Sequence, residues 1–101
     1  MRYKSGLLLH NNEITAPWGP DTLTELTVTD LSTLQQEPPE LLIIGTGKNT
    51  AFPAREVLEW LDAQQIGFEC MGTRAAARTY NILISEGRNV SAAMLLPSIS
   101  N

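Results

Sequence analysis

The residues best suited to chemistry in this chain of 101 amino acids are two arginines near the start of a segment with helical periodicity. Arg74 and Arg78 would lie at the helix N-terminus, where the helix dipole favours negative charge. Two arginines there are slightly unfavourable unless an anion or a carboxylate lies among them. That partner could be a bound ligand, or an internal carboxylate such as Glu69 or Glu86.

Two glycine turns could complete a binding site for such an anion. Gly45-Thr46-Gly47 follows one apolar strand and Gly72-Thr73 follows the next. Ligands of parallel α/β sheets collect outside the carboxyl ends of the strands, and exposed backbone N–H groups there bind anions. We therefore predict a crevice for a phosphate ester or a carboxylate. Its candidate ligand-binding residues are Gly45, Thr46, Gly47, Thr73, Arg74, Arg78, Asn81 and Glu86.

Each of these features also has a purely structural interpretation, which the sequence leaves open. The glycines could serve tight turns alone, because GTGKNT has neither G-x-G-x-x-G spacing nor the phosphate-loop pattern. The stripe of Arg74, Arg78, Asn81 and Ser85 could simply face water. The broader opposite face of that helix is then expected to pack on the core, and its members are Ala75, Ala76, Thr79, Tyr80, Ile82, Leu83 and Ile84.

No catalytic or metal-binding set is predicted. His10 and Cys70 are the single histidine and the single cysteine, too few ligands for a conventional zinc site. His10 lies far from Cys70 in sequence, which argues against a cysteine–histidine dyad and against a serine triad. Cys70 falls in a predicted strand, where a buried and unreactive thiol is expected. No cofactor is expected.

Length and charge narrow the remaining classes. The chain is predicted to form one domain over residues 1–101. Its net charge is −4 and its pI about 4.8, which argues against general binding of nucleic acid. The segment from residue 71 onward is nevertheless locally positive, with three arginines against Glu86 alone. No stretch approaches the roughly 20 apolar residues of a membrane span and the start lacks signal-peptide features, so we expect a cytoplasmic protein.

The first 40 residues are predicted to contribute a hairpin, one further strand and a short helix. The hairpin turns at Asn11 and Asn12, which tolerate positive φ. A later segment alternates Leu26 and Val28 with polar residues, as a half-buried strand does. Asp30 can cap the short helix, which two prolines stop. The predicted ranges are strands 7–9, 13–16 and 24–29, a loop at 17–20 and a helix at 31–36.

The rest of the chain is predicted to alternate strands and helices, which indicates parallel strands joined by right-handed crossovers. The apolar run from Leu41 to Ile44 is typical of a strand covered on both faces. Pro53 suits the first turn of the next helix, and Gly67 suits a left-handed helix exit. Thr73 can cap the second helix, which Gly87 ends. Further strands are predicted at 68–71 and 90–96.

Together these elements predict an α/β fold with the order β-β-β-α-β-α-β-α-β. A central mixed, partly parallel sheet would carry helices packed on it and an N-terminal β-hairpin.

Three segments resemble a widespread small domain of unknown function: PELLIIGTG at 39–47, FP at 52–53 and IGFECMGTRAAARTYNILISEGRNVSAAML at 66–95. Its family includes the mitochondrial complex I assembly factor 3 and the adipogenesis-associated domain protein. The A-A-x-R-T-Y-N and S/A-E-G-R elements, here Ala75–Asn81 and Ser85–Arg88, carry the resemblance. Relatives often have cysteine where this chain has Ala77. The resemblance implies an α/β fold, no established reaction, and action of the mitochondrial relative through protein partners.

Two hypotheses of function follow. The first is a non-enzymatic protein-interaction or assembly factor, with an unidentified protein partner and possible self-association through sheet edges or the apolar segment Ala92–Leu96. The second is an anion-binding protein or enzyme in which Arg78 clamps the ligand. We favour the first, because no catalytic constellation is recognisable.

Overall fold

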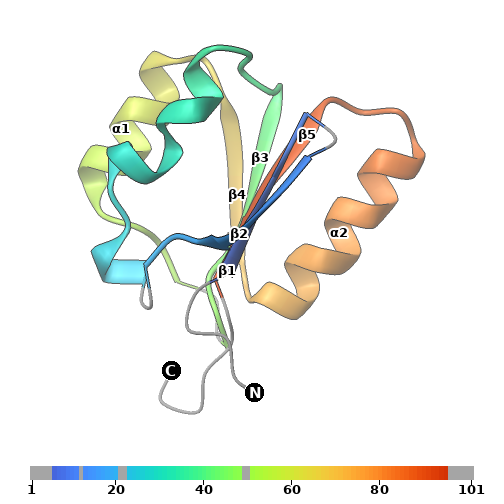
Figure 1. Ribbon diagram of the computed structural model, residues 1–101, viewed down its shortest axis with the longest axis horizontal. Helices are drawn as coiled ribbons and strands as arrows, with labels where there is room; N and C mark the ends of the chain where they lie inside the picture. The colour runs from blue at the N-terminus through green and yellow to red at the C-terminus, as the bar shows by residue number, and fades with distance from the viewer. Residues whose placement is uncertain (1–5, 12, 21–22, 49–50, 96–101) are drawn as a thin grey trace.

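The computed structural model describes residues 6–11, 13–20, 23–48 and 51–95, which form five strands, two α-helices and two 3-10 helices. The strands make one sheet through the middle of the molecule, with helices on both of its faces (Figure 1). Their order across the sheet is β2-β1-β5-β3-β4.

The second half of the chain folds as the predicted β-α-β-α-β unit. Strand β3 (Leu41–Gly45) lies between β4 (Gly67–Met71) and β5 (Val90–Met94) and is parallel to both. Helix α1 (Arg55–Ala63) connects β3 to β4, and α2 (Thr73–Ser85) connects β4 to β5. Every side chain from residue 42 to residue 44 is at most 1% exposed. The prediction of a strand covered on both faces is confirmed.

The predicted N-terminal hairpin is also confirmed. Strand β1 (Gly6–His10) pairs antiparallel with β2 (Glu13–Trp18) on one side and with β5 on the other, so the sheet is mixed. Asn11 has a φ of 56° at the turn, whereas Asn12 lies outside the described residues. The loop predicted to begin at Pro17 begins later, because β2 continues to Trp18. An edge strand tolerates proline, whose missing N–H can face outward.

The strand predicted at residues 24–29 is wrong. Two 3-10 helices, η1 (Leu23–Glu25) and η2 (Val28–Gln35), occupy this region. The carboxylate of Asp30 accepts hydrogen bonds from the N–H and the hydroxyl of Thr27 at 2.9 and 3.2 Å. Asp30 therefore closes the first turn of η2 from inside the helix rather than preceding it. Local capping overrides the alternating pattern, and Leu26 is buried in the turn between the two helices.

The exit of α1 differs from the prediction in one residue. Gln65, not Gly67, takes the left-handed conformation, with a φ of 62°. The N–H of Ile66 then reaches the carbonyl of Leu61 at 2.9 Å, a helix-ending bond. Gly67 opens β4 instead, where an added Cβ would come within 3.2 Å of the carbonyl oxygen of Glu40.

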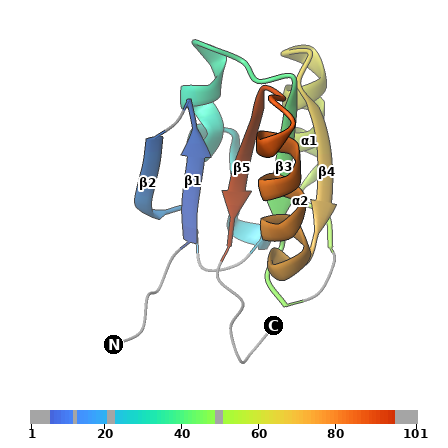
Figure 2. The same ribbon diagram turned by 90° about the vertical axis from the view of Figure 1, so that its right-hand side faces the viewer.

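The sheet separates two apolar cores of unequal extent. The larger core lies under α1, η1 and η2, and the smaller lies under α2 alone (Figure 1). Helix α2 packs on β3 and β5. Figure 2 shows that it leaves β1 and β2 uncovered on its side of the sheet. The buried members of the smaller core are Ile43, Ala76, Val90, Ala92 and Met94.

Helix α2 is less buried than its sequence predicts. Of the seven residues expected on its core face, only Ala76 is fully buried. Ile82 is 57% exposed and Ile84 is 41% exposed. These two lie roughly 200° apart around the helix, so they fall on opposite flanks. The predicted buried face is therefore too broad at these two positions, whereas its other five members are buried or partly buried: Ala75, Ala76, Thr79, Tyr80 and Leu83.

Among the described residues, no helix has both the length and the apolar character needed to cross a membrane.

Candidate functional site

The two glycine turns meet at the carboxyl ends of β3 and β4. The N–H of Thr46 donates to the carbonyl of Met71 at 2.8 Å, and the N–H of Thr73 donates to the carbonyl of Gly47 at 2.7 Å. The structure thus brings together Gly45, Thr46, Gly47 and Thr73, with Arg74 next along α2. This proximity follows from the parallel strands, as predicted.

The hydroxyl of Thr73 links three segments at this end. It accepts a hydrogen bond from the N–H of Gly47 at 2.9 Å and donates one to the carbonyl of Leu95 at 2.6 Å. The N–H of Leu95 in turn donates to the carbonyl of Gly45 at 2.9 Å. Thr73 is not the N-cap that the sequence predicts, since Gly72 holds that position and Thr73 already lies in the helix.

The backbone donors predicted to cradle an anion have partners within the chain. The N–H groups of Thr46 and Gly47 are used as described above, and the Thr46 hydroxyl donates to the carbonyl of Met71 at 3.1 Å. Residues 45–47 are all buried. A Cβ added to Gly45 would lie 2.9 Å from the sulfur of Met94 and 3.0 Å from the Thr73 hydroxyl oxygen, so a larger residue here would push against α2 and β5. An anion at this end would therefore meet side chains rather than these N–H groups.

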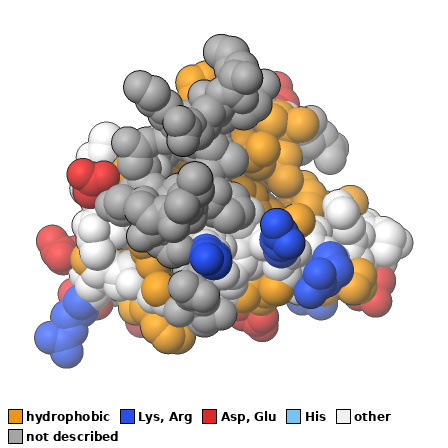
Figure 3. Space-filling model, turned by 90° about the horizontal axis from the view of Figure 1, so that it is seen from below, with side chains coloured by type: hydrophobic (Ala, Val, Ile, Leu, Met, Phe, Trp, Pro, Cys, Tyr) orange, Lys and Arg blue, Asp and Glu red, His pale blue; other side chains and the backbone are white. Residues whose placement is uncertain are grey.

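Three exposed basic side chains border this end of the sheet: Lys48, Arg74 and Arg78. Figure 3 looks onto this end and shows Lys and Arg side chains gathered beside a broad strip of apolar surface. Within the described part of the chain, neither arginine forms an ion pair, either with Glu69 or with Glu86. The sequence predicted the position of these charges but not what they contact.

Two of the predicted site residues lie away from the glycine turns. Asn81 is exposed two turns along α2 from Thr73, and Glu86 follows the far end of the helix. A separation of 13 residues in helical geometry corresponds to about 20 Å between Thr73 and Glu86. The structure therefore does not bring Glu86 to the crevice predicted at Gly45–Gly47.

The thiol of Cys70 and the imidazole of His10 lie in different surroundings and do not form a common site. Burial raises the pKa of the Cys70 thiol to about 11, so it is protonated at neutral pH and a poor nucleophile. Cys70 is half-buried against the larger core. His10 Nδ1 lies 2.7 Å from the hydroxyl oxygen of the buried Ser91. In the described parts of the chain, no group of three or more His, Cys, Asp or Glu side chains could hold a metal ion.

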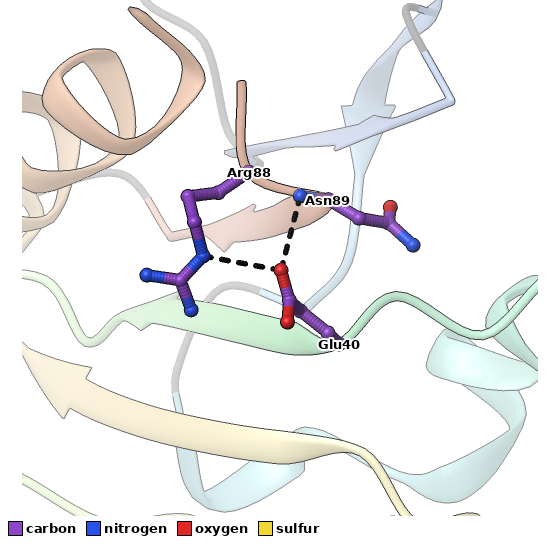
Figure 4. Close-up of polar contacts among 3 residues, drawn as sticks. All are labelled: Glu40, Arg88 and Asn89. Atoms are coloured by element: carbon purple, nitrogen blue, oxygen red, sulfur yellow. Dashed lines mark hydrogen bonds and ion pairs between the residues drawn. The ribbon is translucent and has the colours of Figure 1, made fainter. Parts of the chain in front are cut away.

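Arg88 acts at the opposite end of the sheet from the glycine turns. Its Nε lies 3.1 Å from Oε1 of Glu40, and the N–H of Asn89 donates to the same oxygen at 3.4 Å (Figure 4). The N–H of Glu40 donates to the carbonyl of Asn89 at 3.0 Å. The hydrogen bond from Arg88, the one from Asn89 and the charge of Arg88 lower the pKa of Glu40 below its ordinary value of 4.5. The contact joins the amino ends of β3 and β5.

Comparison with known proteins places the chain in a family. The family described as "Protein of unknown function (DUF498/DUF598)" matches residues 1–95. The chain belongs to this family. This DUF498/DUF598 member is 37% identical over 94 residues to an uncharacterised protein of Rhodobacter capsulatus, covering 92% of the chain and 70% of that protein.

Other relatives carry descriptions of their own. The NADH dehydrogenase [ubiquinone] 1 alpha subcomplex assembly factor 3 of Danio rerio is 35% identical over 82 residues, which are 79% of this chain and 47% of that protein. The 13 kDa major membrane protein of Francisella tularensis is 30% identical over 71 residues, which are 70% of this chain and 58% of that protein. The chain thus spans about half the length of these two relatives. The predicted family resemblance is confirmed.

Solved structures agree with the α/β fold. An NMR structure from Xanthomonas campestris has a TM-score of 0.82 and 34% identity, covering 97% of this chain and 74% of that one. A crystal structure described as an outer membrane protein of Bartonella henselae has a TM-score of 0.82 and 27% identity, covering 95% of this chain and 82% of that one.

Replacing Thr73 tests the link between the three segments. Thr73→Val keeps the shape but leaves the N–H of Gly47 and the carbonyl of Leu95 without their partner, so we expect a loss of about 1–3 kcal/mol in the free energy of unfolding. Thr73→Ser keeps the hydroxyl and should lose less. Denaturant unfolding followed by circular dichroism measures both. Equal stability of the valine variant and the unsubstituted chain would contradict a role for the hydroxyl.

Acid should weaken the Glu40–Arg88 contact. Because the folded state lowers the pKa of Glu40, its carboxylate stabilises the fold above pH 4.5, and this contribution disappears as pH falls through the lowered pKa. Glu40→Gln should therefore be less stable than the unsubstituted chain at neutral pH, and the difference should shrink in acid. Melting temperatures across this range measure it. A difference in stability that did not depend on pH would contradict a stabilising Glu40–Arg88 contact. Arg88→Gln removes the other partner of this contact and serves as the matched variant.

Proposed function

We propose that this chain is a non-enzymatic protein-interaction domain that binds a protein partner in an assembly role. The family is one of unknown function, and the Danio rerio relative is named as an assembly factor. The observation that supports the proposal best is that α2 leaves β1 and β2 uncovered (Figure 2) and that apolar side chains lie on this part of the sheet.

This area, which we call the open face, consists of Leu7, Leu9 and Ile14. Leu7 and Leu9 pack against the smaller core yet remain partly exposed. Ile14 lies directly across from Leu9 in the β1–β2 register and is 68% exposed. Paired residues of antiparallel strands share a face, so the three side chains form one continuous apolar area. Contiguous exposed apolar patches are common at protein interaction sites, which supports the proposal.

One flank of α2 borders the open face. Thr73, Tyr80 and Ile84 follow one another at seven and four residues, which places them on the same side of the helix. The Thr73 hydroxyl reaches the end of β5, so this flank is turned toward β5 and β1. Ile84 adds partly exposed apolar surface there. At the end of the sheet where α2 begins, Lys and Arg side chains lie beside apolar surface, so positive charge borders the apolar surface there (Figure 3). A partner segment with apolar side chains and acidic groups would complement it.

Glutamate substitutions on the open face test this function. Ile14→Glu and Ile84→Glu place charges on the binding area without disturbing either core, so both should lower affinity for the partner at least tenfold, about 1.4 kcal/mol. Quantitative affinity purification from the native host, followed by titration of the recovered partner, measures the loss. Ile82→Glu is the matched control, since it makes the same change on the opposite flank. Equal binding by all three variants would count against the open face.

A second candidate function is binding of a small anion at the start of α2. Its support is local: Arg74 and Arg78 are exposed, form no ion pair with a described residue and lie at the positive end of the helix dipole. Lys48 adds a third positive charge nearby. In this proposal Arg78 contacts the anion in a two-pronged geometry.

Inorganic phosphate is a suitable probe for this second function. If the site exists, phosphate should raise the melting temperature relative to chloride at the same ionic strength, and Arg78→Ala should abolish that rise while leaving the melting temperature in chloride unchanged. Arg55→Ala, on α1, is the control for loss of one exposed arginine. Equal stabilisation of Arg78→Ala and the unsubstituted chain would exclude Arg78 as the ligand.

A further inference from the structure

We infer that this chain associates with a second copy of itself through the outer flank of α2. The contact surface is a ridge of Arg78, Ile82 and Glu86, spaced four residues apart along the helix. Ridges with this spacing are the ones that most often pack between helices. The inference goes beyond the proposed function, because the ridge and the open face lie on opposite flanks of α2.

Ile82 forms the centre of this ridge. At 57% exposure it is the more exposed of the two isoleucines of α2, and it belongs to neither apolar core. Its neighbours one and two turns earlier on the same flank, Thr79 and Ala75, are small and half-buried. A facing helix could therefore approach closely and remove the isoleucine side chain from water.

The charges on either side of Ile82 are opposite and have no partner in the described chain. Arg78 and Glu86 are both exposed, and neither forms an ion pair with a described residue. The N–H of Glu86 donates to the carbonyl of Ile82 at 3.2 Å, so helical geometry continues through Glu86. Eight residues of helix separate the two charges by about 12 Å along the axis, with Ile82 between them.

This order of positive, apolar and negative groups is complementary to itself. A two-fold rotation about an axis through Ile82 makes the two copies of α2 antiparallel. Arg78 of each copy then faces the partner's Glu86, and the two isoleucines meet. Two-fold contacts that use the same patch on both copies are the commonest kind in soluble homo-oligomers. Two copies with a net charge of −4 each repel one another overall, and the facing pairs of Arg78 and Glu86 would offset this repulsion at the contact. A contact limited to one helix is small, so we expect weak, concentration-dependent association.

Charge reversal tests this arrangement on the full chain. Sedimentation velocity over a concentration series should show reversible dimers of the unsubstituted chain. Arg78→Glu and Glu86→Arg each place like charges opposite one another, so each should weaken self-association at least tenfold. An equimolar mixture of the two variants should associate again, because every charge on the ridge of the mixed pair faces its opposite. Recovery on mixing would show that the charges of the two ridges face one another across the contact.

Three further variants distinguish a contact through this ridge from a contact through the open face or a general effect of charge. Ile82→Glu should abolish the dimer, whereas Ile84→Glu, on the other flank, should leave it intact while weakening binding of the partner protein. Asp62→Arg makes the charge change of Glu86→Arg on α1 and should have no effect. Circular dichroism checks that each exposed substitution leaves the fold unchanged. The inference would be overturned if the chain stayed monomeric at every concentration, or if the mixture associated no more strongly than either single variant. Neither result would bear on the proposal that a protein partner binds the open face.

Discussion

The position of α2 on the sheet depends on the two hydrogen bonds of the Thr73 hydroxyl. This hydroxyl uses its donor and its acceptor to join the ends of β3 and β5 to the start of α2. Gly45 lacks a side chain where the start of α2 lies against β3, since an added Cβ would lie 3.2 Å from the Cα of Thr73. Because this end of α2 is fixed over β3 and β5, the helix cannot also cover β1 and β2. The uncovered apolar area is thus a consequence of how the helix is anchored.

The parallel half of the fold could be predicted from sequence because its signals are local and agree with one another. The apolar run of β3, its glycine turn and the next helix start all indicate the same unit. The strand predicted at residues 24–29 failed because two contacts from Thr27 to Asp30 outweigh the alternation of Leu26 and Val28. No periodic pattern in the sequence reports such a choice between a pleated strand and a capped turn.

The candidate site was predictable in position but not in chemistry. Parallel strands bring the two glycine turns together, as any α/β sheet would. The bond from Thr73 to Leu95 joins residues 22 positions apart, so nothing near Thr73 in sequence indicates that its hydroxyl is already engaged. The apolar residues of α2 misled in a similar way. Their number predicts that all of them pack on the core, whereas Ile82 and Ile84 are exposed on two separate flanks of the helix.

The outer edges of the sheet determine what sort of assembly these exposed surfaces can build. A strand with free N–H and C=O groups beside an apolar area invites endless addition of further strands. On β2 such addition meets Pro17, which has no N–H to donate, and the pairing of β2 with β1 is irregular next to it, between Gly6 and Leu8 of β1. On β4 the addition meets the exposed charge of Glu69 at the middle of the strand. Growth into fibres through backbone pairing is therefore discouraged at both edges, and the association that we propose would use side-chain surfaces instead.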